Sequence, residues 1–222
     1  MKIVVISDTH NRYQELTIPE CDVLIHAGDI SHAGEIQILD DFVKWARSQR
    51  VKETVFIGGN HDSTLQTSTY IQEQINSLPD IHYLEDSELK LFGFKFYGSP
   101  WQPRYKDMAF NLDRNSNELD QAWQKIPEDV DVLITHTPPY GILDKLEDER
   151  GGFNAGCERL ADRLKQVPAK IHAFGHVHEA RGVRCEKNTT YVNASVYSKN
   201  DQRKVRGPML FEVNQTGVSL LN

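Results

Sequence analysis

Residues 2–10 of the chain read KIVVISDTH, a hydrophobic run that ends directly in Asp8 and His10. The Val and Ile residues of this run are typical of a buried β-strand. Side chains two residues apart in an extended segment point to the same side, so the Asp8 carboxylate and the His10 imidazole can bind one metal ion. The run therefore predicts a buried strand that ends in a metal-binding pair.

Four further hydrophobic runs end in similar side chains. Their endings are Gly28-Asp29, Gly59-Asn60-His61-Asp62, His136 and Gly175-His176-Val177-His178. Taken alone, each fragment is explained equally well as a turn, a helix cap or a polar loop. All five in this order, each at the end of a predicted strand, indicate one shared site, because ligand sites in open α/β sheets gather at the carboxyl ends of strands.

The first half of the chain alternates predicted strands with predicted helices. The strands cover residues 2–7, 22–27, 53–57 and 81–84, and the helices cover residues 34–50 and 67–78. Residues 88–92 and 94–97, joined at Gly93, predict a hairpin. Residues 99–115 form a long aromatic loop, in which the segment Trp101–Arg104 is either a lid or a wall of the substrate site.

The second half of the chain ends in short strands. We expect helices at 117–125 and 157–166, strands at 131–135 and 170–174, a polar, mobile loop at 146–156, and short strands at 183–186, 189–193, 208–213 and 218–221. Alternating strands and helices followed by hairpins imply an α/β fold of two packed mixed β-sheets, a β-sandwich, flanked by helices. One domain spanning residues 1–222 is the economical interpretation.

Composition and charge narrow the classes of function. No stretch approaches the roughly 20 apolar residues of a membrane helix, and the first apolar run is too short for a signal peptide. The formal net charge of −7 argues against nonspecific binding to nucleic acid, which needs a basic surface. Three widely spaced cysteines without a CxxC pair fit reduced thiols. We therefore expect a cytoplasmic protein with a small-molecule substrate, and the oligomeric state stays open.

The five fragments supply enough ligands for two divalent ions. Asp29 can bridge both ions through its two oxygens, which would place them about 3.5–4 Å apart, as in two-metal hydrolases. Mixed Asp, His and Asn ligation suits transition metals rather than Mg²⁺ or Ca²⁺. Mn²⁺ is the expected ion, and Fe, Zn, Ni and Co are alternatives. Water between two such ions ionises near neutral pH and can attack a phosphorus atom.

One histidine of these fragments stays free for proton transfer. His61 follows the predicted ligand Asn60 and precedes Asp62, whose carboxylate could hold the imidazole and favour its protonated form. His61 and Asp62 would then act together as the catalytic acid that protonates the leaving oxygen.

Other polar residues have a structural explanation or two open ones. Three histidines lie inside predicted strands and are expected to be structural: His26, His82 and His172. His32 is either a solvated loop residue or a substrate contact. Asn193 ends a predicted strand and is either part of a turn or a hydrogen-bond partner that supports the metal ligands.

The five fragments follow the pattern D-x-H, G-D, G-N-H-[DE], H and G-H-x-H over residues 8–178. In this pattern the chain resembles the calcineurin-like metallophosphoesterases, and the resemblance implies a β-sandwich flanked by helices. It also implies roles for the site residues. The first metal would be bound by Asp8, His10 and His178 and the second by Asn60, His136 and His176, with Asp29 as the bridge and His61 as the general acid.

Further segments resemble the metallophosphoesterase-domain (MPPED-type) subgroup. They are residues 97–103 (YGSPWQP), 135–144 (THTPPYGILD), 156–157 (GC) and 192–195 (VNAS). The resemblance implies hydrolysis of phosphodiesters, including 2′,3′-cyclic or 3′,5′-cyclic nucleotides. Weakly active members lack the first histidine of G-H-x-H, whereas this chain has His176, so we expect an active enzyme.

Two alternatives remain open at this stage. A phosphomonoesterase or protein phosphatase of the same superfamily would need extra cations near the metals, for which Arg104, Arg114 and Arg150 are candidates. A nuclease would need a basic track, and the chain offers only the short cluster 203–206. The alternative from another class is a catalytically weak nucleotide-binding or scaffold protein that keeps the fold.

Overall fold

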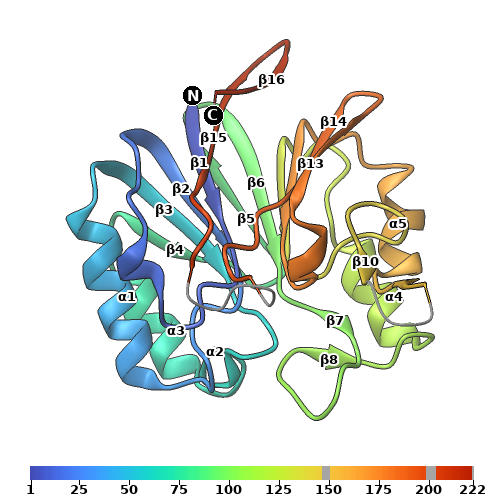
Figure 1. Cartoon of the computed structure of the whole chain (residues 1–222), viewed down its shortest axis with the longest axis horizontal. Helices are drawn as coiled ribbons and strands as arrows, with labels where there is room; N and C mark the ends of the chain where they lie inside the picture. Colours follow the sequence, from blue (N-terminus) through green and yellow to red (C-terminus); the bar gives the residue numbers. More distant parts are fainter. Residues whose placement is uncertain (147–150, 199–203, 222) are drawn as a thin grey trace.

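Two six-stranded mixed sheets pack face to face in this protein, and helices cover their outer faces (Figure 1). The structure is a computed structural model, and it describes residues 1–146, 151–198 and 204–221. Apolar side chains of both sheets fill the space between them, with Val5, Ile25 and Ile57 from one sheet against Phe96 and Ile134 from the other. The α/β sandwich flanked by helices is therefore confirmed.

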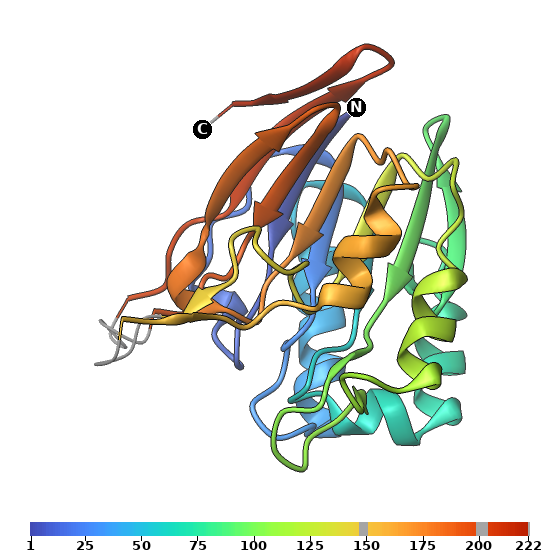
Figure 2. The ribbon, with the colours of Figure 1, turned by 90° about the vertical axis from the view of Figure 1, so that its right-hand side faces the viewer.

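The first sheet has the strand order β16-β15-β1-β2-β3-β4. Its strands are β1 Lys2–Ile6, β2 Cys21–Ala27, β3 Val51–Ile57, β4 Ile81–Tyr83, β15 Met209–Asn214 and β16 Gly217–Leu220. Strands β1 to β4 are parallel, and β15 and β16 join them as an antiparallel hairpin. Figure 2 shows the tip of this hairpin beside the N-terminus, at the opposite end of the sandwich from the carboxyl end of β1.

The second sheet has the strand order β13-β14-β12-β9-β6-β5. Its strands are β5 Ser87–Leu91, β6 Phe94–Ser99, β9 Val132–Thr135, β12 Ile171–Phe174, β13 Gly182–Glu186 and β14 Thr189–Asn193. The four central strands are parallel, and the antiparallel pair β5 and β6 is the hairpin predicted at Gly93. Central parallel strands are covered on both faces, which explains their continuous Val and Ile content.

Five α-helices within the described residues cover the two outer faces. They are α1 Ile36–Ser48, α2 Ser63–Thr67 and α3 Thr69–Asn76 on the first sheet, and α4 Asn117–Gln124 and α5 Glu158–Leu164 on the second (Figure 1). Phe42 of α1 and Trp123 of α4 are the largest fully buried side chains of these helices and anchor them to the sheets. Among the residues described, every helix is too short or too polar to span a bilayer.

The helix predicted at 67–78 is α3, which is two residues shorter at each end, and the short helix α2 before it was not predicted. Ser68 lies between the two helices with an extended backbone, at φ −123° and ψ 94°, and its side chain accepts a hydrogen bond from the Ile71 nitrogen. Serine is a strong N-cap because its oxygen satisfies a free backbone N–H of the first turn. The cap therefore explains why α3 begins at Thr69, two residues after the predicted start.

Both predicted long loops contain short paired segments. In the loop 99–115, β7 (Gln102–Pro103) pairs with β8 (Asn111–Leu112). In the loop 146–156, β10 (Lys145–Leu146) pairs with β11 (Phe153–Asn154). Residues 147–150 between them lie outside the described residues, so the predicted mobility of this part of the loop falls outside them as well. These pairings hold the two loops against the carboxyl ends of the strands.

Candidate metal centre

The carboxyl ends of β1, β2, β3, β9 and β12 meet at one end of the sandwich and bring the predicted ligands together. The histidines and aspartates form three groups in which the ligand atoms lie within 4.8 Å of one another, and Asp29 belongs to two of them. The two groups that share Asp29 are Asp8, His10, Asp29 and His178, and Asp29, His136 and His176, and the third group is His10, His32 and His61. Fragments far apart in the sequence therefore form two adjacent sites with a shared carboxylate.

The first group is compact. The Nε2 atom of His178 lies 3.1 Å from Oδ1 of Asp8 and 3.5 Å from Nε2 of His10. The Nε2 atom of His10 lies 3.8 Å from Oδ2 of Asp29. Ligands about 2.1 Å from an ion and at right angles to each other are about 3 Å apart, so these separations fit a divalent transition metal.

Asn60 completes the second group. Its Oδ1 atom lies 2.9 Å from Nε2 of His136 and 2.8 Å from Nδ1 of His176. The Nε2 atom of His136 lies 3.5 Å from Oδ2 of Asp29. The Nδ1 atom of His136 faces the backbone oxygen of Ala27 at 2.9 Å, which orients the ring so that Nε2 points into the group. The residues present therefore fit a second ion beside the first.

Four of the seven predicted ligands have an unusual backbone conformation. Asp8, His10, Asp29 and His176 have φ values of 55°, 43°, 57° and 65°, in the left-handed region that non-glycine residues rarely adopt. Each such residue costs about 1–3 kcal/mol and persists only where its surroundings hold it. Strain of this kind clusters at functional sites, and here it aims side chains from adjacent strand ends at a common centre.

Neighbouring charges shift the pKa values of the ionisable side chains in both groups. Burial alone would raise the pKa of the Asp8 and Asp29 carboxyls, but His178 and His136 outweigh it and hold both pKa values well below their usual range. Burial opposes the proton on His136, yet Asp29 raises the pKa of this imidazole to about 9. Burial lowers the pKa of His176 to about 3. A metal ion entering the second group must therefore displace a proton from His136.

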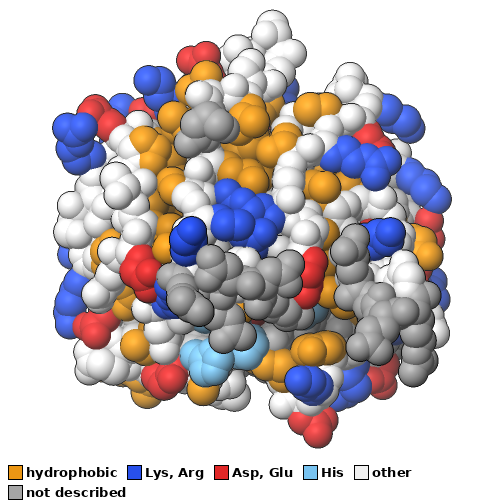
Figure 3. Space-filling model, in the orientation of Figure 1, with side chains coloured by type: hydrophobic (Ala, Val, Ile, Leu, Met, Phe, Trp, Pro, Cys, Tyr) orange, Lys and Arg blue, Asp and Glu red, His pale blue; other side chains and the backbone are white. Residues whose placement is uncertain are grey.

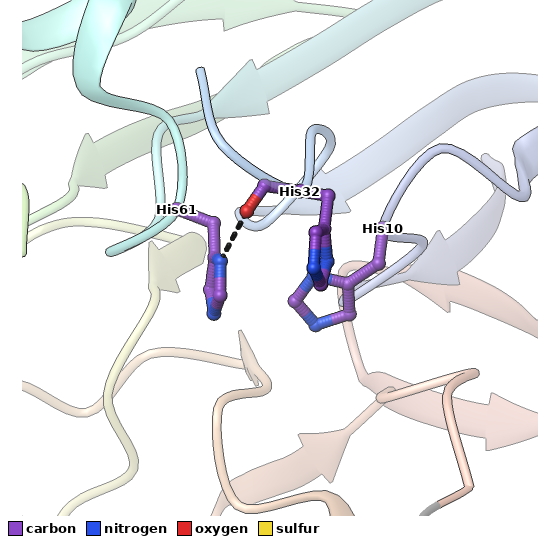
Figure 4. A group of neighbouring side chains, drawn as sticks. All are labelled: His10, His32 and His61. Atoms are coloured by element: carbon purple, nitrogen blue, oxygen red, sulfur yellow. Dashed lines mark hydrogen bonds between the residues drawn. The ribbon is translucent and has the colours of Figure 1, made fainter. Parts of the chain in front are cut away.

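Asp62 does not hold the His61 ring, so the structure contradicts that predicted role. The Nδ1 atom of His61 faces the backbone oxygen of His32 at 2.6 Å (Figure 4). The Asp62 carboxylate is fully buried and accepts hydrogen bonds from the nitrogen and hydroxyl of Ser31, at 2.8 and 2.7 Å, and from the Gly59 nitrogen at 2.9 Å. Asp62 thus links two ligand loops through their backbone.

His61 and His32 lie at the edge of the first group. The His61 ring is 4.7 Å from the His10 ring and edge-on to it, and it is stacked at 5.5 Å on the His32 ring (Figure 4). His32 is exposed, and its ring also lies 5.8 Å from that of His10. His32 is therefore a loop residue whose side chain lines the entrance to the site, and substrate contact stays a prediction for it.

The three histidines within strands make their hydrogen bonds to side chains outside the two ligand groups. His26 lies 2.9 Å from the Thr9 hydroxyl, His172 lies 2.8 Å from the Thr135 hydroxyl, and His82 lies 2.8 Å from Glu53. Asn193 supports the ligands. Its side-chain nitrogen donates to the backbone oxygens of Val177 and Leu143, at 2.8 and 3.1 Å, and so fixes the loop that carries His176 and His178.

A cavity of about 210 Å³ opens beside the second group. Its lining combines histidines with apolar side chains of the two long loops, namely Pro103, Tyr105, Leu146 and Phe153. Histidines and hydrophobic side chains lie side by side at the surface in this region (Figure 3). The Tyr105 ring lies 5.7 Å from that of His176, so the aromatic loop is a wall of the site. Trp101 anchors that loop, because its Nε1 donates to Asp86 at 3.1 Å.

Two arginines line the cavity within the described residues. Arg104 is bound to Asp113 through a 2.6 Å contact, and Arg114 is bound to Glu158 through a 2.5 Å contact. The third candidate, Arg150, lies outside the described residues. Both candidate cations that the structure describes are therefore paired with exposed carboxylates.

Tyr197 was not predicted from the sequence. Its ring lies 5.3 Å from the His10 ring and 5.1 Å from the His178 ring, on the side of the first group. It follows the VNAS segment, whose Ser195 pairs with Ser7 next to Asp8. The signal in the sequence was that Tyr197 lies two residues after the VNAS segment, although no motif predicts a tyrosine there.

Two ligand groups that share a carboxylate, at the end of a helix-flanked β-sandwich, define the class of metal-dependent phosphoesterases. The sequence model described as calcineurin-like phosphoesterase matches residues 1–180. The chain belongs to the calcineurin-like phosphoesterase family, whose members are phosphoric ester hydrolases with a binuclear divalent metal site.

Curated relatives agree with the subgroup resemblance. The chain is 36% identical to human metallophosphoesterase domain-containing protein 1 over 234 residues, which cover 96% of this chain and 71% of the human protein. It is 33% identical to a UPF0046 protein of Caenorhabditis elegans over 231 residues, which cover 99% of this chain and 77% of the nematode protein.

Solved structures show the same fold at low identity. The protein TT1561 of Thermus thermophilus has a TM-score of 0.65 at 13% identity, with 100% of this chain and 98% of that chain covered. An archaeal phosphodiesterase has a TM-score of 0.51 at 13% identity, with 100% of this chain and 99% of that chain covered.

Proposed function

We propose that this chain is a binuclear, Mn²⁺-dependent phosphodiesterase that hydrolyses small phosphodiesters, with 2′,3′-cyclic or 3′,5′-cyclic nucleotides as the leading substrates. The main support is that Arg104 and Arg114, which line the cavity, are each bound to a carboxylate. A diester carries a single negative charge and does not need an arginine clamp, whereas a monoester dianion gains most from one. The solved archaeal relative described above is a phosphodiesterase, which agrees with this choice of reaction.

The distances within the two groups support a ligand assignment. Asp8, His10 and His178 would hold the first ion, Asn60, His136 and His176 would hold the second, and Asp29 would serve both sites. When bound, two divalent ions lower the pKa of water and neutralise the charge that develops on a phosphoryl group. Mixed nitrogen and oxygen donors favour Mn²⁺, with Fe, Zn, Ni and Co as alternatives.

His61 is the proposed proton donor. A carbonyl oxygen only accepts hydrogen bonds, so the contact with the His32 backbone requires a proton on Nδ1 of His61. The second proton of the imidazolium then sits on Nε2, the nitrogen at the free edge of the ring. From there His61 can protonate the leaving oxygen as the P–O bond breaks. Asp62 contributes by fixing the backbone of the loop rather than by touching the ring.

The second candidate is phosphomonoester hydrolysis. It is favoured by the position of Arg104 and Arg114 on the cavity wall, because exposed ion pairs are worth little and can open for a dianion. A catalytically weak binding or scaffold protein is a poorer explanation, because the chain has all seven predicted metal ligands and the proposed proton donor His61.

A cytoplasmic location is also part of the proposal. Cys21, Cys157 and Cys185 are all free, as is usual in reducing compartments. We further propose that the partner is a small-molecule phosphodiester rather than a membrane or a nucleic acid.

A substrate panel separates the three candidates. Protein loaded with Mn²⁺ is assayed with bis(p-nitrophenyl) phosphate, p-nitrophenyl phosphate and both classes of cyclic nucleotide at the same pH. The proposal expects a higher kcat/KM for the aryl diester than for the monoester. A reversal by tenfold or more would establish a phosphatase, and two bound ions without turnover of any ester would establish a binding protein.

A further inference from the structure

A buried histidine–threonine pair lies beneath the first ligand group. His26 of β2 is fully buried against the helix layer, and its Nε2 atom lies 2.9 Å from the hydroxyl of Thr9. Thr9 stands between Asp8 and His10. Its hydroxyl also donates to the backbone oxygen of Ile30, which follows the bridging carboxylate, at 3.3 Å. One side chain of β2 thus connects to two ligand loops through a single hydroxyl.

The second sheet contains an equivalent pair. His172 of β12 is fully buried, and its Nε2 atom lies 2.8 Å from the hydroxyl of Thr135. Thr135 immediately precedes His136. Its hydroxyl also donates to the backbone oxygen of Thr137 at 2.8 Å, which closes the chain around His136. In each sheet a buried histidine therefore reaches the threonine next to a metal ligand.

The hydrogen-bond network assigns the same tautomer to both histidines. Each threonine hydroxyl has one proton and uses it on a backbone oxygen, so the histidine Nε2 must be the donor to the threonine oxygen. The Nδ1 atoms of His26 and His172 are buried without a partner in the described structure. An unpartnered lone pair is less costly there than an unpartnered N–H, which agrees with this assignment.

The hydrogen bond of the first pair acts where the backbone needs support. Thr9 is flanked by Asp8 and His10, whose φ values of 55° and 43° lie in the left-handed region. Such a conformation persists only when its surroundings hold it in place. The threonine hydroxyl is the side-chain contact between these two ligands, so its loss would let the loop relax and the ligands move apart.

We propose that the pairs His26–Thr9 and His172–Thr135 are positioning residues, the first for the first metal site and the second for the second metal site. The inference rests on the ligand assignment proposed above. Side chains behind metal ligands are known to change metal affinity by about 10–100-fold when they are lost, because they orient the ligands. Each pair should therefore control the affinity of its own site.

The test measures Mn²⁺ binding to metal-free protein by isothermal titration calorimetry. Thr9→Val removes the hydroxyl at nearly constant volume, and Thr9→Ser keeps it. Thr135→Val and Thr135→Ser form the same comparison for the other pair. Thr54→Val, at a buried threonine in the middle of β3, is the matched control. The Tm of each metal-free variant shows whether the fold is intact.

Each valine variant should weaken one of the two binding steps by about 10–100-fold and leave the other unchanged. The serine variants and the control should bind as the wild type does. His26→Leu should weaken the same step as Thr9→Val, and the double variant should be no weaker than either single one, because one hydrogen bond is removed in all three.

Wild-type affinity in both valine variants would overturn the proposal, and so would equal weakening of both steps together with a lowered Tm. Both results concern the variants alone, so neither bears on whether the wild type hydrolyses diesters. If the wild type itself binds fewer than two Mn²⁺ ions, the ligand assignment fails, and the positioning proposal fails with it.

Discussion

Gly175→Ala adds one methyl group at the point where the last ligand loop crosses the first. A Cβ atom on Gly175 would lie 2.1 Å from Oδ2 of Asp8 and 2.1 Å from Oγ of Ser7. Gly175 itself is not in the left-handed region, so alanine meets no backbone penalty there. The substitution therefore isolates the effect of the close approach between the two loops.

The expected magnitude follows from the size of the overlap. Ordinary contact begins near 3.4 Å, so the new methyl group is about 1.3 Å too close to the Asp8 carboxylate. Asp8 and Ser7 are fully buried, so the carboxylate has to shift by about that distance. A displacement of about 1 Å in a catalytic site costs about 10²-fold in rate, or about 2.7 kcal/mol in the barrier. Overpacking of this kind also costs about 1–3 kcal/mol in the free energy of unfolding.

The assay combines Mn²⁺ titration, kcat/KM for an aryl phosphodiester and Tm. Gly217→Ala is the matched control, because a Cβ atom there meets open space. Gly175→Ala should lose about 10²-fold in kcat/KM and bind Mn²⁺ more weakly. A variant with wild-type Mn²⁺ affinity and turnover would refute the reasoning, because it would show that Asp8 does not need its present position.

Three further predictions concern the same centre. Metal analysis after reconstitution with Mn²⁺ should approach two ions per chain; Asp29→Ala should lose both, and Asn60→Ala should weaken one site more than the other. Because the pKa of His136 in the metal-free protein is raised to about 9, a proton competes with the ion below that pH. Mn²⁺ affinity should therefore rise with pH towards 9, and calorimetry in buffers of different ionisation enthalpy should detect the released proton. His61→Ala should keep both ions but lower kcat by about 10²–10⁴, more for a cyclic nucleotide than for a nitrophenyl ester. His32→Ala keeps the backbone oxygen that orients His61 and should leave this leaving-group dependence unchanged.

The sequence was sufficient to predict the twelve strands of the two large sheets and the ligand fragments, but not the short strands β7, β8, β10 and β11. Parallel strands are hydrophobic throughout, so each one ends visibly where the first polar side chain appears, as at Asp8 and His136. All such ends lie on one edge of their sheets, so proximity followed from topology alone. The order of the five fragments then gave the resemblance to the calcineurin-like metallophosphoesterases.

Contacts between loops could not be predicted in the same way. Asp62 is adjacent to His61 in the sequence, yet its carboxylate accepts hydrogen bonds from the side chain and backbone of Ser31, thirty-one residues earlier in the chain, and not from the His61 ring. Adjacent residues in a tight turn point in different directions, so sequence neighbourhood was a poor guide to contact. The pairing of His26 with Thr9 was missed for a related reason, since neither residue belongs to a ligand motif.

Both candidate ligand groups draw side chains from both sheets. Asp8 and His10 come from the first sheet and are completed by His178 from the second, while Asn60 from the first sheet meets His136 from the second. The relative position of the sheets therefore determines the spacing of the ligands. Bound ions should therefore stabilise the folded sandwich by a free energy that grows with the logarithm of their affinity, because an ion that binds only the folded state shifts the unfolding equilibrium. The left-handed backbone at the ligands, which is unfavourable by itself, is then offset by the binding of the metals that it positions.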